Sequence, residues 1–200
     1  PGRLKLIGLQ RADHDHFGTQ SIIAFAGRDP FGTRFERIGE EGETIGRGEY
    51  RWTMLGGDWQ ASGEAAFNRL DNVARLFRLG SDGAFAEVPF PSGTGGVRED
   101  RYEALLSHSR AVTPRLSLQA IVGGEVSRIA QTGAGALSRT FQRPKGSLAV
   151  AWNTALGLDL NLELARRVGQ LDFGDFLARV NITDDNTNAG NNELRPEQSW

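Results

Sequence analysis

The feature that most constrains the fold of this chain is a strict alternation of leucines between positions 156 and 164. The intervening positions carry glycine or polar side chains: Gly157, Asp159, Asn161 and Glu163. A period of two puts all five leucines on one face only in a β-strand, because a helix repeats about every 3.6 residues. This stretch therefore predicts a strand with one apolar and one polar face.

The segment 59–67 alternates in the same way and has an aromatic residue at each end, Trp59 and Phe67. Eight residues at about 3.3 Å each, tilted by about 40°, would separate the two rings by about 20 Å along a barrel axis. Membrane β-barrels carry two girdles of aromatic side chains on either side of an apolar band about 25 Å tall. The spacing favours such a barrel, although a soluble sandwich can show it by chance.

The turn and loop signals predict how the strands connect. Glycine, proline and polar clusters indicate short turns at 28–32, 56–58, 113–115 and 153–155. Longer connections are expected at 12–18, 39–48, 69–97, 129–146 and 167–197, with a small hairpin of 73–79 and 84–88 inside the third. Residues 98–112 have a helical composition, but their alternation predicts a strand.

This pattern of connections predicts an all-β chain, an antiparallel up-and-down meander of about 8–10 strands that forms part of a large transmembrane β-barrel. Short turns on one rim and long loops on the other are typical of outer-membrane barrels, whereas a sandwich has no reason to sort its connections. Residues 1–200 are interpreted as one segment of such a barrel. Because ten or so strands cannot close a larger barrel, we expect an open curved sheet with two unpaired edges.

Composition excludes several classes of protein. The formal charge is −2, so there is no basic footprint for nucleic acid. There are no cysteines, which excludes disulfide scaffolds and cysteine-bound metals. No apolar run approaches the roughly 18 residues of a membrane-spanning helix. The chain starts at Pro1 without a visible signal peptide, and we expect it to be a segment of a longer protein.

Few residues suggest chemistry. Asp13, His14 and His16 are weak candidates for contacting a ligand from an extracellular loop, but each face of that segment offers only two potential metal ligands. The residues from Asp184 to Asn188 have the spacing that opens a calcium loop, yet Arg195 stands where a bidentate glutamate is needed. The sequence predicts no catalytic residue, metal site or cofactor, and therefore no enzyme.

Polar side chains on the alternating strands need an environment that suits them. Glu64, Asp159, Asn161 and Glu163 would line a hydrated lumen in a barrel, while their apolar neighbours would contact lipid. In a soluble protein the same side chains would face water, and the leucines would form the core. Alternation alone leaves both interpretations open.

The residues near the C-terminus carry a family resemblance. The run from Gly190 to Ser199 resembles the "GN-x-x-L-x-P-E-x-S" signature of TonB-dependent outer-membrane receptors, just before a late barrel strand. Its matching residues are Asn191, Leu194, Pro196 and Glu197, and it departs from the family pattern at Asn192, where proline is commonest. Segments 47–52, 57–60, 64–68 and 166–171 are similar to barrels of this family too.

The resemblance implies a location in the bacterial outer membrane and energised uptake of a scarce nutrient such as a siderophore, cobalamin, a carbohydrate or a peptide. The inner-membrane energising complex would act through a region outside this chain, where the plug domain and the remaining strands are also expected. The leucine strand would then rise from the periplasmic rim, with 167–195 as an extracellular loop containing a strand or hairpin near Phe176–Ile182. Two alternatives stay open, a passive porin-like barrel and a soluble β-sandwich binding module.

Overall fold

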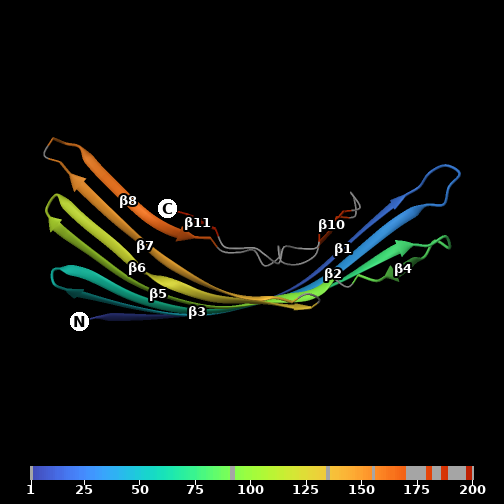
Figure 1. Cartoon of the computed structure of the whole chain (residues 1–200), viewed down its shortest axis with the longest axis horizontal. Helices are drawn as coiled ribbons and strands as arrows, with labels where there is room; N and C mark the ends of the chain where they lie inside the picture. Colours follow the sequence, from blue (N-terminus) through green and yellow to red (C-terminus); the bar gives the residue numbers. More distant parts are fainter. Residues whose placement is uncertain are drawn as a thin grey trace.

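Figure 1 shows a long curved β-sheet whose two lateral edges are open. The structure is a computed structural model that describes residues 2–90, 93–133, 136–154, 156–169, 179–181, 186–188 and 197–199. Its strands are β1 (Arg3–Ile23), β2 (Phe31–Met54), β3 (Gly57–Leu79), β4 (Phe85–Val88), β5 (Thr94–Thr113), β6 (Leu116–Gly133), β7 (Ser138–Asn153), β8 (Asp159–Val168), β9 (Arg179–Asn181), β10 (Asn186–Asn188) and β11 (Gln198–Ser199). In this described part, no helix is long and apolar enough to cross a bilayer.

The main sheet has nine strands and follows chain order, β1-β2-β3-β5-β6-β7-β8-β11, with β4 paired to the end of β3. Every pairing is antiparallel. The predicted all-β antiparallel meander is therefore confirmed, and so are the strand at 98–112 and the hairpin of 73–79 with 84–88. β9 and β10 form a separate two-stranded hairpin within the segment expected to be a loop.

The expected open edges are present on both sides of the sheet. Among the described residues, β1 pairs only with β2 along its 21 residues. On the far side, the described part of the chain covers β8 only where Gln198 and Ser199 of β11 pair with Val168 and Arg167. The exposed backbone groups of these edges are free to pair with further strands.

Successive connections alternate between two rims, although not as first expected, and their lengths overlap, since the interval 134–137 on one rim is shorter than 154–158 on the other. On one rim the strands turn at Leu55–Gly56, at Pro114–Arg115 and between Asn153 and Asp159. On the opposite rim the intervals are 24–30, 80–93, 134–137 and 169–197. The turn predicted at 28–32 belongs to this second rim, not to the rim of 56–58, because the strands on either side of it are longer than expected. We call the two ends of the sheet at which the strands turn the short-turn rim and the long-connection rim.

Three predicted loops are wrong, and for one reason. Residues 12–18 lie within β1, 39–48 lie within β2, and most of 129–146 belongs to the paired strands β6 and β7. These segments carry polar side chains on both faces, so they lack the alternation that marks a strand half-buried in apolar surroundings. Backbone pairing continues through these segments because the neighbouring strands extend alongside them.

The leucine run occupies a turn and the start of a strand. β8 begins at Asp159, so Leu156 and Leu158 precede it, and Gly157 adopts a positive φ of 77° that suits glycine in a tight turn. Within β8, Leu160, Leu162 and Leu164 share one face as predicted. The strand runs from the short-turn rim toward the long-connection rim, also as predicted (Figure 1).

Strand register extends the two faces of β8 across the whole sheet, because residues directly opposite one another point the same way. The leucine face carries Leu160, Leu162 and Leu164 together with their register partners, and the polar face carries the alternate residues. Burial is the reverse of that in a soluble protein: Glu125 and Arg143 on the polar face are 5% and 4% exposed. On the leucine face, Val122 of the central strand β6 is 63% exposed.

This difference identifies the polar face as the concave one, since side chains converge on the inside of a curved sheet and spread apart on the outside. The polar face also buries some apolar residues, namely Phe35, Ala66, Ala74, Val97 and Ile129. The leucine face is left uncovered, because the described strands form a single layer.

Candidate functional site

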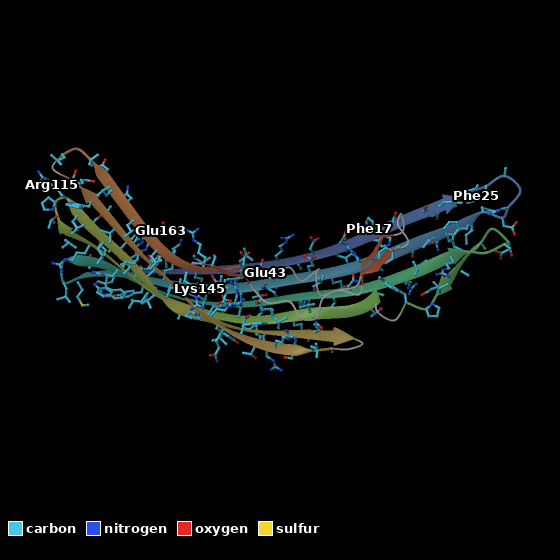
Figure 2. All side chains as sticks on the ribbon, turned by 45° about the horizontal axis from the view of Figure 1, so that its top comes forward. Phe17, Phe25, Glu43, Arg115, Lys145 and Glu163 are labelled. Carbon is cyan, nitrogen blue, oxygen red and sulfur yellow. The ribbon has the colours of Figure 1, made fainter. Side chains whose placement is uncertain are left out.

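The polar face holds a network of ion pairs centred on Glu125 of β6. The Arg143 guanidinium donates to the Glu125 carboxylate and to Ser127 Oγ, the latter at 2.6 Å. Lys145 Nζ contacts the other Glu125 oxygen and Glu103 Oε2 at 2.5 Å. Consecutive long strands with matched register bring these side chains together, since Glu125 lies directly opposite Arg143 and Glu103. Lys145 is labelled near the middle of the sheet in Figure 2.

The network continues toward β2. Arg101 Nη2 donates to Glu64 Oε1 at 3.0 Å, and Arg47 Nη1 lies 3.6 Å from Glu64 Oε2. Arg47 Nε is in turn 2.9 Å from Glu49 Oε1, and Arg51 Nη2 is 3.6 Å from Glu49 Oε2. The band of ion pairs therefore crosses five strands, from β2 to β7.

The charges of this band balance. Five carboxylates belong to it: Glu49, Glu64, Glu99, Glu103 and Glu125. Five cations face them: Arg47, Arg51, Arg101, Arg143 and Lys145. A buried charge is tolerated when it is paired and hydrogen-bonded, and here every charge has an opposite partner, although the Nε atoms of Arg47, Arg101 and Arg143 lack a hydrogen-bond acceptor. The band is thus suited to a hydrated wall that cross-links neighbouring strands, and it leaves no spare charge for a small ion.

The leucine face has a row of aromatic rings near the short-turn rim. Tyr50 stacks on Trp52 with 5.5 Å between ring centroids, and Trp52 stacks on Trp59 at 6.2 Å. Trp59 then contacts His108 of β5 at 4.2 Å. The row crosses β2, β3 and β5, so the aromatic end of segment 59–67 is one part of a continuous belt.

A second aromatic pair stands farther along the same face, where Phe67 and Tyr102 meet edge to face at 6.0 Å. Tyr102 is displaced by two residues from Asp100, the register partner of Phe67. In a barrel whose strands tilt by about 40°, residues at the same height on neighbouring strands are offset from register partners by about 4 Å, or roughly one residue. A diagonal pairing at constant height is therefore expected. Between the two rows the face is apolar or small.

The residues predicted to line a lumen share one face. Register places Glu64, Asp159, Asn161 and Glu163 together on the polar face. Glu64 belongs to the ion-pair band, and Glu163 lies 3.5 Å from Arg167 on β8. Toward the short-turn rim the same face is hollowed into a shallow cavity of about 840 Å³, whose lining includes Asn161 and Glu163.

The histidine candidates lie in a strand and not in a loop. Asp13, His14 and His16 all belong to β1, with the histidines on the leucine face and Asp13 on the polar face. Asp13 pairs with Arg11 at 3.3 Å, and His14 Nδ1 is 3.8 Å from Glu40 Oε1. Within the described ranges, no group of three or more His, Cys, Asp or Glu side chains is arranged to hold a metal ion.

The family signature falls largely outside the described residues, which include Glu197 but not Asn191, Leu194 or Pro196. The Gly169 amide donates to the Glu197 carbonyl at 2.9 Å, and Arg166 Nη2 donates to Gln198 Oε1 at 2.7 Å. The chain therefore rejoins the sheet beside β8 through the last residues of the signature, Glu197 to Ser199. Its predicted position before a late strand agrees with this pairing.

Sequence reasoning missed the ion-pair band. Arg101, Glu103, Glu125, Arg143 and Lys145 are far apart in the sequence, and all but Glu125 lie in segments that resembled a helix (98–112) or a loop (129–146). An available signal was their shared alternation, since each belongs to a strand whose register can be counted from its turn.

Comparison with known proteins gives no assignment: no protein-family model matches the chain, and no curated protein matches it.

Proposed function

We propose that this chain is a β-barrel segment of a TonB-dependent outer-membrane receptor that imports a scarce nutrient. The observation that carries the membrane part of the proposal is the reversed burial of the two faces. Glu125 and Arg143 are buried while Val122 and Leu162 are 63% and 72% exposed. An uncovered apolar face of this extent is costly in water and stable against lipid.

The aromatic rows support the same environment. Trp59 and Phe67 are eight positions apart on a strand, which corresponds to about 20 Å along the normal of a bilayer for a tilt of about 40°. Rings in both rows would then lie at the two interfaces of the hydrocarbon core, where aromatic side chains are enriched.

The strand lengths favour a receptor over a simple pore. β2 has 24 residues, so it would span about 60 Å along a tilted barrel wall, far more than the apolar band of about 25 Å. The excess lies toward the long-connection rim, and it includes the stretches 10–16 of β1 and 40–44 of β2, which carry polar side chains on both faces. A wall of this height would enclose a deep outer vestibule with room for a bulky solute such as a metal chelate, a cofactor, an oligosaccharide or a peptide.

The assignment to the TonB-dependent class rests on the signature between Asn191 and Ser199. A soluble β-sandwich is disfavoured because it would need a second sheet against the leucine face, and the described residues supply only the short β9–β10 hairpin outside the main sheet. A passive porin remains the competing outcome of the experiment below.

Topology tests the proposal in the complete protein expressed in a Gram-negative host. An epitope inserted at Arg28, on the long-connection rim, should be accessible on intact cells, whereas one inserted at Gly56, on the short-turn rim, should require permeabilised cells. Recovery of both epitope-tagged variants in the soluble fraction would refute the membrane assignment.

Uptake assays then separate a receptor from a porin. Cells carrying the complete protein should accumulate one of a panel of labelled ferric siderophores, cobalamin, oligosaccharides or peptides, and lose that accumulation when the energising complex is deleted. Accumulation that persists without the complex would point to the passive barrel.

A further inference from the structure

Three arginines stand together on the leucine face, just beyond the Phe67–Tyr102 pair on the side of the long-connection rim. Arg69 follows Phe67 by two residues on β3, and Arg98 lies directly opposite Arg69 on β5. Arg128 belongs to the next strand, β6, where it lies directly opposite Asp100 and two residues from the register partner of Arg98. All three side chains are exposed.

The described residues provide no ionic partner for this arginine cluster. Arg69 and Arg98 form no ion pair there, and Arg128 donates only to the Ser138 hydroxyl at 3.3 Å. Two carboxylates share the face without pairing to these guanidinium groups: Asp71 and Asp100. Like charges directly opposite across strands destabilise a sheet, so Arg69 and Arg98 are unfavourably placed unless an external anion lies between them.

The polar face makes the contrast clear, because its cations in the ion-pair band are all matched by carboxylates. The cations of the ion-pair band on the concave polar face therefore have carboxylate partners. The arginine cluster on the leucine face has none among the described residues. An anion for the arginine cluster must come from the medium that contacts the leucine face.

The height of the cluster identifies that medium. Two residues at about 3.3 Å, on strands tilted by about 40°, place the guanidinium-bearing positions about 5 Å beyond the aromatic pair. A bilayer has a hydrocarbon core of about 30 Å and a total thickness of about 40–45 Å, so this level, about 15 Å from the midpoint between the aromatic rows, lies at the boundary between the core and the headgroups. A long arginine side chain at that level extends into the headgroup region, where it binds phosphate through two parallel N–H···O contacts.

Resting on the proposed membrane location, we propose that Arg69, Arg98 and Arg128 form a binding site for the phosphorylated headgroups of membrane lipids. The lipid would bridge β3, β5 and β6 from outside, at the leaflet nearer the long-connection rim. The site holds the barrel at a fixed depth and is separate from solute passage on the polar face.

The test compares vesicles of phosphatidylcholine alone with vesicles of phosphatidylcholine and phosphatidylglycerol in equal parts. The complete protein is refolded into both, and its unfolding equilibrium in urea is measured. We expect the wild type to gain stability in the anionic vesicles, and Arg69→Gln with Arg98→Gln to remove about fivefold of that gain in the folding constant per arginine. Arg98→Lys should retain most of it, and Arg28→Gln, on a distant connection, should retain all of it.

Each contrary outcome has a distinct meaning. An equal folding constant in the two vesicles, or an unchanged gain in the double variant, would refute the headgroup site while leaving the barrel intact. Inorganic phosphate that reproduces the gain in neutral vesicles would show that the ligand is a free anion and overturn the lipid assignment. Failure to insert into either vesicle would overturn the proposed function itself.

Discussion

Val122→Arg is expected to destabilise the membrane-inserted protein by about 2–4 kcal/mol, the cost of an arginine at the lipid-facing midplane of a barrel. Val122 lies on the leucine face of β6, midway between Leu118 and Val126. Allowing about one residue of shift per strand, those two residues are level with Trp59 and Phe67. The substitution therefore falls at the centre of the apolar band.

The size of the effect depends on the solvent and not on packing. The Val122 side chain is 63% exposed although β6 has neighbours on both sides, so an arginine there meets no protein atoms that must move. In water such a surface change typically alters stability by no more than about 0.5 kcal/mol. In lipid, about 2–4 kcal/mol corresponds to about a 30- to 900-fold loss in the folding constant.

The assay is urea unfolding of the complete protein in neutral lipid vesicles, followed by tryptophan fluorescence. Gln119→Arg is the matched control, because Gln119 is exposed on the polar face of the same strand and would face a hydrated lumen. Leu160→Arg, level with the tryptophan row, should have an intermediate or small cost, since the penalty falls to about 0–1 kcal/mol near the interfaces.

Equal tolerance of arginine at 122 and 119 would refute the membrane reasoning, because the two faces would then meet the same solvent. A large cost at 119 and none at 122 would also refute it. That result would mean that the polar face contacts the apolar medium and the leucine face contacts water.

Three further results are expected from the same unfolding assay. Arg143→Met should cost about 1–3 kcal/mol because buried Glu125 and Ser127 lose their hydrogen bonds from Arg143, although Lys145 still contacts Glu125. Adding Glu125→Gln should recover part of the loss, and a neutral Arg143→Met would contradict the importance of the pair. Gly123→Ala should cost about 1–3 kcal/mol, since a Cβ there would meet the Ala104 carbonyl oxygen at 2.0 Å. Gly39→Ala is the control and should be neutral, because there is open space around Gly39. Equal effects of the two substitutions would contradict the close strand packing at Gly123. Trp59→Ala should cost more than about 1 kcal/mol by breaking two ring contacts, and a neutral result would show that the aromatic row is incidental.

The sequence was most informative where one face of a strand is apolar. The alternation around Leu160 and between Trp59 and Phe67 predicted strands and faces that the structure confirms. Alternation disappears where both faces are polar, as around His14 and Glu41, and these segments were wrongly predicted as loops. Hydrogen bonding between strands extends through them regardless, and that interaction leaves no periodic trace in the side chains.

The candidate site shows the same division. Alternation along the individual strands predicted that Glu64 and Glu163 face the same side of the sheet, which the register bears out. It did not find the pairing of Glu125 with Arg143 and Lys145, because the position of β7 relative to β6 depends on where the strands turn between 133 and 138. If the loop boundary is predicted wrongly there, the cross-strand partners of the residues in β7 cannot be predicted correctly.

Among the described residues, β1 and most of β8 leave one edge unpaired, which has a consequence for how the proposed barrel would enter a membrane. In lipid each backbone N–H or C=O without a partner costs several kcal/mol, and β1 alone presents such groups along 21 residues. Partial insertion of this sheet would be strongly uphill, so its entry into a bilayer must coincide with closure by the strands that pair with both edges. Biogenesis of the proposed barrel would then be all-or-none, and half-assembled sheets would be held outside the hydrocarbon, where they are exposed to chaperones and proteases.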